Sequence, residues 1–221
     1  MHFHLPKPLH GWREFAGEVG IIVVGVLIAL GAEQVVENWN WHQKVGIVRQ
    51  SLMGELANDR GRWQVGMIDA RCSMRDIEEL DLWAKGGASG KAPRAASDID
   101  NRGFFWMHSA NWNLATSSET LDHLPIDEQL AFAALYDGIE HRQVDIVKAT
   151  DLFDRVVALI PLAGDEQGRR ELRLTLGQLR LKIEALTHNN GYMERHFERL
   201  GVKPDRSDIV ADMAPARRCA G

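Results

Sequence analysis

Histidine is the residue type here best suited to chemistry, because its imidazole binds metals and transfers protons near neutral pH. The chain has nine histidines. None belongs to a His-Glu-x-x-His zinc motif or to the Glu-x-x-His motif of di-iron bundles. His188, Tyr192 and His196 would share one helical face, where solvated side chains at a bundle edge are the simpler interpretation. We predict no metal site and no cofactor.

Other catalytic signatures are also missing from the sequence. It contains no G-x-S-x-G nucleophile motif, no phosphate-binding glycine loop with lysine and no G-x-G-x-x-G motif. Acidic residues are spread over the expected helix surfaces, so no carboxylate pair for acid–base work can be chosen. We therefore name no catalytic residue, and we favour a non-enzymatic protein while leaving enzymatic activity open. Cys72 and Cys219 either pair in an oxidising compartment or remain unpaired thiols.

The segment 106–118 (WMHSANWNLATSS) is the best candidate for a recognition surface. It combines aromatic, amide, hydroxyl and imidazole groups without helical periodicity, and ligand pockets mix these residue types. The candidate ligand or partner residues are Trp106, His108, Asn111, Trp112 and Asn113. In the alternative interpretation, the two tryptophans close the end of a helical bundle and the polar residues cap helices.

Long tracts without proline surround this segment. Because proline breaks helix interiors, the tracts 9–92, 126–160 and 162–203 are free to form long helices. Apolar residues recur in each at alternating steps of three and four, which is typical of a helical bundle. About five residues after Pro161 join the second tract to the third, so these helices should be antiparallel neighbours.

The ends of these helices carry recognisable signals. Gly86-Gly87 should end the first, and Gly201, followed by Pro204, should cap the third in a left-handed conformation. A Thr116-x-x-Glu119 capping box predicts a short helix ending near Leu124. Two polar residues interrupt the apolar seams, Arg142 in the second helix and Asn190 in the third, where they could fix register or lie at the bundle edge.

An uncharged apolar run decides where the protein is expected to reside. Val19–Ala32 has 14 residues, short of the about 20 that span a bilayer. Trp12 and Trp39 lie 27 residues apart, roughly 40 Å along a helix, which matches a bilayer with tryptophan at both interfaces. We expect an uncleaved single-pass anchor. A cleaved signal peptide and a buried helix of a soluble protein are the alternatives.

One arc of this helix is formed mostly by small residues, which would let a second membrane helix approach closely. The predicted packing face comprises Gly17, Gly20, Gly25, Ala29, Gly31 and Ala32. The predicted partners are therefore the lipid bilayer and a second copy or another membrane helix. Arg13 lies nearer the apolar run than Lys44, which favours a cytoplasmic N-terminus. A net charge of −5 gives no basic footprint for nucleic acid.

The block from Gly17-Glu18 through Gly25–Leu30 to Glu37 and Trp39 resembles the N-terminal signature of an uncharacterised bacterial family of small single-pass membrane proteins. The resemblance covers residues 14–41. It implies a bacterial membrane protein with a helical domain after the anchor. The family has no assigned activity, so the resemblance implies no functional residues.

These observations together predict an all-α protein in the bacterial inner membrane. We expect a cytoplasmic tail (1–14), a transmembrane helix with its interfacial flank (15–41), a periplasmic helical bundle (42–203) and a C-terminal tail (204–221). The bundle should contain three long antiparallel helices and one short capped helix. The favoured function is a membrane-anchored interaction or sensor module. The alternatives are a ligand-binding domain or enzyme using residues 106–118, and a soluble exported protein.

Overall fold

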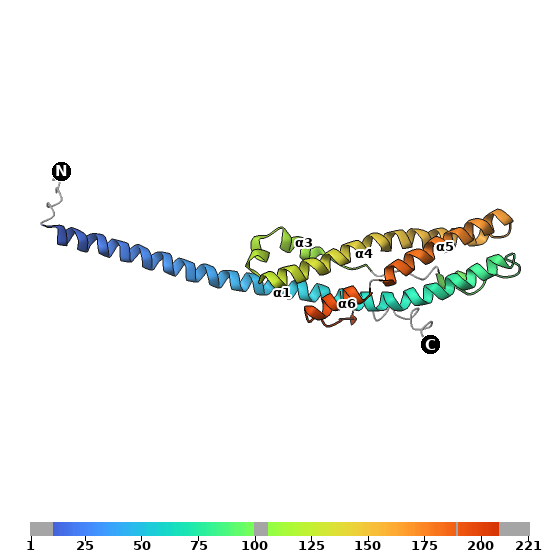
Figure 1. The fold of residues 1–221 in the computed structure, drawn as a ribbon, viewed down its shortest axis with the longest axis horizontal. Helices are drawn as coiled ribbons and strands as arrows, with labels where there is room; N and C mark the ends of the chain where they lie inside the picture. The colour runs from blue at the N-terminus through green and yellow to red at the C-terminus, as the bar shows by residue number, and fades with distance from the viewer. Residues whose placement is uncertain (1–10, 100–105, 189, 208–221) are drawn as a thin grey trace. The chain divides into compact units, whose positions relative to one another are not determined.

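The computed structural model describes residues 11–99, 106–188 and 190–207. The fold is all-α, as predicted, and no strand occurs in the described ranges. The α-helices are α1 (Trp12–Lys85), α2 (Ala95–Asp98), α3 (Ala110–Thr116), α4 (Ile126–Leu159), α5 (Glu166–His188) and α6 (Asn190–Arg199) (Figure 1). Two short 3₁₀ helices are η2 (Glu119–His123) and η3 (Ile160–Leu162). The chain divides into two units, Met1–Ile47 and Val48–Gly221.

The first unit contains the apolar part of α1, which is long and apolar enough to cross a membrane. None of its most apolar stretch is buried against other parts of the protein. Ile21 is 75% exposed and Ile28 is 68% exposed. On the predicted packing face, a Cβ added at Gly17, Gly20, Gly25 or Gly31 would meet no other atom within 4 Å. The apolar surface of this helix is therefore uncovered.

In the second unit, α4 and α5 pack side by side (Figure 1). They are antiparallel because η3 and a few further residues form the whole connection. Pro125 precedes α4 and Pro161 lies just after its end, where a ring without an N–H is tolerated. The seam residues predicted from periodicity form the core, including Leu80, Ile146, Phe153, Leu176 and Ile183.

Helix ends follow the predicted signals in two places. α1 ends at Lys85, and Gly87 has a φ of +85°. After α6, Gly201 has a φ of +67°, and the Val202 N–H donates to the Phe197 carbonyl in a Schellman-type cap. The predicted third helix is described as α5 and α6, which are separated only by Asn189, a residue outside the described ranges.

α6 and the chain after it pack against α1. The Arg60 guanidinium binds both the Glu194 carboxylate and the Val202 carbonyl. Trp63 and Phe197 lie beside one another, with ring centroids 6.0 Å apart. Further along, the Asp205 N–H donates to the Ala57 carbonyl at 2.7 Å.

Gly61 permits this last contact, because a Cβ at position 61 would lie 1.8 Å from the Asp205 carbonyl oxygen. We expect Gly61→Ala to lower the free energy of unfolding by about 1–3 kcal/mol, since the backbone at Asp205 must move away. The control is Gly54→Ala, where a Cβ meets open space and the higher helix propensity of alanine should add up to about 1 kcal/mol. Denaturant unfolding of the full chain in non-ionic detergent measures both. Equal effects of the two substitutions would contradict the close approach.

Candidate functional site

The segment predicted to form a recognition surface lies across α1 and α4 and contains α3. α3 was not predicted, because its seven residues are too few to show helical periodicity. The predicted capping box is wrong in detail. Thr116 is the last residue of α3, and its hydroxyl donates to the carbonyls of Trp112 and Asn113. Ser118 is the N-cap of η2, with its hydroxyl oxygen accepting from the Thr120 N–H. Two short elements thus replace the one that was expected.

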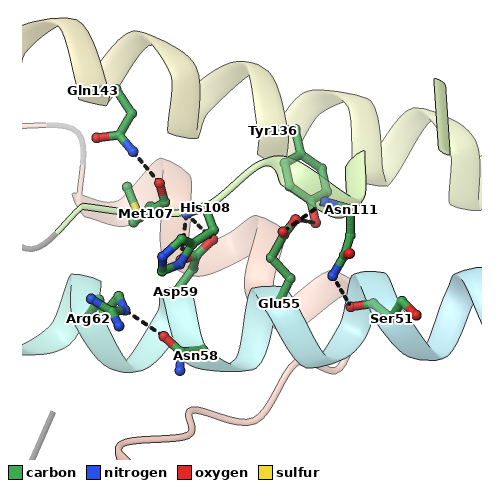
Figure 2. Close-up of polar contacts among 10 residues, drawn as sticks. All are labelled: Ser51, Glu55, Asn58, Asp59, Arg62, Met107, His108, Asn111, Tyr136 and Gln143. Atoms are coloured by element: carbon green, nitrogen blue, oxygen red, sulfur yellow. Dashed lines mark hydrogen bonds and ion pairs between the residues drawn. The ribbon is translucent and has the colours of Figure 1, made fainter. Parts of the chain in front are cut away.

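Asp59 of α1 binds the beginning of this segment (Figure 2). Its side chain is fully buried. The His108 backbone N–H donates to both carboxylate oxygens, at 2.9 and 3.0 Å. The His108 imidazole Nδ1 lies 3.3 Å from Asp59 Oδ1, while half of the His108 side chain remains exposed. Next to it, the Gln143 amide of α4 donates to the Met107 carbonyl. The chain at Met107–His108 is therefore held from both helices.

Glu55, one helical turn before Asp59, binds the next part of the segment (Figure 2). Its Oε2 accepts from the Asn111 backbone N–H at 2.9 Å, and its Oε1 accepts from the Tyr136 hydroxyl at 2.8 Å. The Asn111 side-chain amide donates to the Ser51 carbonyl at 3.2 Å. A single carboxylate thus connects α1, α3 and α4.

The two tryptophans of the segment have different environments. The Trp112 ring stacks on Tyr136, with centroids 4.8 Å apart and planes at 9°. Trp106 is 52% exposed, and Asn113 is also exposed. The structure therefore brings His108, Asn111 and Trp112 together on α1 and α4, and leaves Trp106 and Asn113 at the surface.

Glu55, Asp59 and Tyr136 were missed as members of this site, and the expectation that the acidic residues lie on helix surfaces is wrong for part of α1. Asp59, Asp69 and Asp76 are buried. A signal for Asp59 exists in the sequence. The apolar seam steps from Leu56 directly to Trp63, and Asp59 occupies the skipped position, three residues after one and four before the other.

The electrostatics of the site follow from this burial. Burial raises the pKa of Asp59 to about 7. The hydrogen bond from the His108 N–H acts in the opposite direction, and the neighbouring Glu55 carboxylate adds to the increase. Burial and the Glu55 carboxylate also raise the pKa of Tyr136 far above its ordinary value, so its hydroxyl remains a donor. A carboxyl group of this pKa takes up and releases a proton near neutrality.

The polar seam residues are placed only in part. Arg142 of α4 is largely buried, and its Nη1 donates to the Leu186 carbonyl at 2.7 Å. The side chain of Asn190 lies outside the described part of the structure. Within the described residues, no group of three or more His, Cys, Asp or Glu side chains could hold a metal ion. Comparison of the chain with protein-family models, curated proteins and solved structures gives no match.

We expect Asp59→Asn to flatten the dependence of stability on pH. Folded Asp59 has a pKa near 7 and its unfolded value is near 4. Folding therefore takes up a proton between these values, and the contribution of Asp59 to stability falls as pH rises toward 7. Asparagine retains an acceptor for the His108 N–H without this penalty. Denaturant unfolding at pH 5, 6, 7 and 8 measures this. The free energy of unfolding of the variant, relative to that of the parent, should rise by about 1 kcal/mol per pH unit up to pH 7. Parallel curves for the two proteins would contradict the raised pKa.

The two tryptophans provide a matched pair for testing the docking of the segment. Trp112→Ala removes the stack on Tyr136 and should lower the free energy of unfolding by about 2–4 kcal/mol. Trp106→Ala removes a half-exposed ring and should change it by less than about 1 kcal/mol. Thermal and denaturant unfolding measure the difference. A larger loss for Trp106→Ala than for Trp112→Ala would show that the segment docks differently.

Proposed function

We propose that this chain is a single-pass membrane protein whose helical domain serves as an interaction or sensor module and catalyses no reaction. The observation that carries the proposal is the uncovered apolar surface of α1 within the Met1–Ile47 unit. Every large aliphatic side chain from Val19 to Leu30 is at least 41% exposed. Apolar surface in water is unfavourable by about 25 cal/mol per Å², which favours a hydrocarbon environment for this helix.

The uninterrupted helix supports an anchor over a cleaved leader. α1 continues through Ala32, where signal cleavage would fall, and far beyond it. The helix of a soluble core would instead be buried by its own domain, and this stretch is not. The resemblance of residues 14–41 to bacterial single-pass proteins favours the inner membrane as its location. The small-residue face remains available for a second membrane helix.

Cysteine chemistry supports a periplasmic domain. Cys72 of α1 is buried and disulfide-bonded, and the other cysteine of the chain, Cys219, lies outside the described residues. Disulfides persist in oxidising compartments such as the bacterial periplasm and are rare in the cytosol. The position of Arg13 before the apolar run favours the same orientation, with the N-terminus in the cytoplasm.

Membrane extraction tests the proposal. The full chain should remain in the membrane pellet after alkaline carbonate treatment, with its N-terminus intact. A double Val24→Lys, Ile28→Lys variant should leave the pellet, because each charge in the bilayer centre costs about 2.5–3.5 kcal/mol. A matched control, Leu174→Lys with Leu181→Lys, changes two exposed leucines of α5 and should stay in the pellet.

Two results would contradict this proposal, and a third would contradict only the orientation. Recovery of the intact parent in the supernatant would show a soluble protein. A mature N-terminus near Ala32 would show an exported one. In the same preparation, alkylation of denatured protein should leave Cys72 unmodified until reductant is added. A freely alkylated Cys72 would contradict the periplasmic orientation alone.

A further inference from the structure

A pocket of about 310 Å³ lies between α4, the end of α5 and the beginning of α6. Ala185, Leu186, Tyr192 and Met193 supply its apolar lining. Gly138 of α4 lets α6 come close, since a Cβ there would lie 2.8 Å from Met193 Sδ and 3.3 Å from Tyr192 Cε1. This volume is at the lower end of the range of about 300–1,000 Å³ for ligand pockets. The space therefore suits a small molecule.

Arg142 also lines this pocket, and it is the largely buried cation of the α4 seam. Its guanidinium donates one hydrogen bond to the Leu186 carbonyl of α5. That bond uses one of the five N–H donors of a guanidinium. Among the described residues, no carboxylate forms an ion pair with Arg142, although buried charges are normally paired.

The two carboxylates beside the pocket already have basic neighbours. Asp145 Oδ1 lies 3.1 Å from the Lys182 ammonium. Asp137 Oδ1 lies 3.4 Å from Nδ1 of His141. Burial lowers the pKa of Arg142 to about 10, and the Asp145 carboxylate offsets only part of this effect. The positive charge of Arg142 is thus desolvated without a direct counter-charge, and a bound anion would relieve this cost.

We propose that this pocket binds a small organic carboxylate. The carboxylate pairs with the free donors of Arg142, and the apolar body of the ligand contacts Leu186, Tyr192 and Met193. A planar guanidinium matches a carboxylate through two parallel hydrogen bonds. Because Asp137 and Asp145 also line the pocket, it suits a monovalent amphiphilic anion better than a phosphate dianion. The inference would give the proposed sensor module its ligand class. All of these residues lie in the Val48–Gly221 unit, so the site does not depend on the membrane anchor.

Titration calorimetry with benzoate tests the inference, using the full chain in non-ionic detergent. Benzamide, nearly the same in shape but uncharged, is the control ligand. Arg142→Met removes the charge and keeps an apolar side chain, a type of change that buried ionic sites often tolerate. Arg155→Met alters an exposed arginine of the same helix and is the control variant. The parent and Arg155→Met should bind benzoate at least tenfold more tightly than benzamide, and Arg142→Met should lose at least tenfold in benzoate affinity.

Three outcomes would overturn the inference. The first is that the parent shows no saturable binding at benzoate concentrations up to about 10 mM, because a Kd above this value corresponds to negligible affinity. The second is equal binding of benzoate and benzamide, which needs no variant and so remains decisive if Arg142→Met does not fold. The third is unchanged benzoate affinity in a folded Arg142→Met. Carbonate extraction gives the same result in each case, so failure here is distinguishable from failure of the membrane proposal.

Discussion

Two carboxylates on one face of α1 hold the segment 106–118 in place, and the packing of this part of the domain depends on them. Glu55 and Asp59 are one turn apart, and each accepts a backbone N–H from the segment. A buried carboxylate without donors would be strongly unfavourable. The segment therefore supplies the donor that the buried Asp59 requires, and Asp59 in turn holds the segment in place. Tyr136 extends this mutual dependence to α4 through its bond to Glu55.

The long helices could be predicted from the sequence because several independent signals agree there. In α4 and α5, apolar residues recur at steps of three and four, prolines lie only near the ends, and the connection is too short for anything except an antiparallel pair. Gly201 likewise predicted the end of α6, because few other residues adopt a positive φ at low cost. Each of these features is local in the sequence.

The candidate site could be predicted only in part, because its chemistry comes from residues distant in sequence. His108, Asn111 and Trp112 stand out by composition, but their partners lie between 24 and 60 residues away. Asp59 occupies a position of the apolar seam, which was a usable signal of its burial. A search for periodic apolar residues misses it because Asp59 is itself polar.

The close approach at Gly138 has a consequence for how sequences related to this one can vary. The α4 backbone and the side chains of Tyr192 and Met193 compete for the same space at this point. An alanine at 138 would require the Met193 side chain to move, or a shorter residue at 193. Positions 138 and 193 should therefore change together over evolution, and an alignment deep enough to detect covariation would reveal this helix contact without any coordinates.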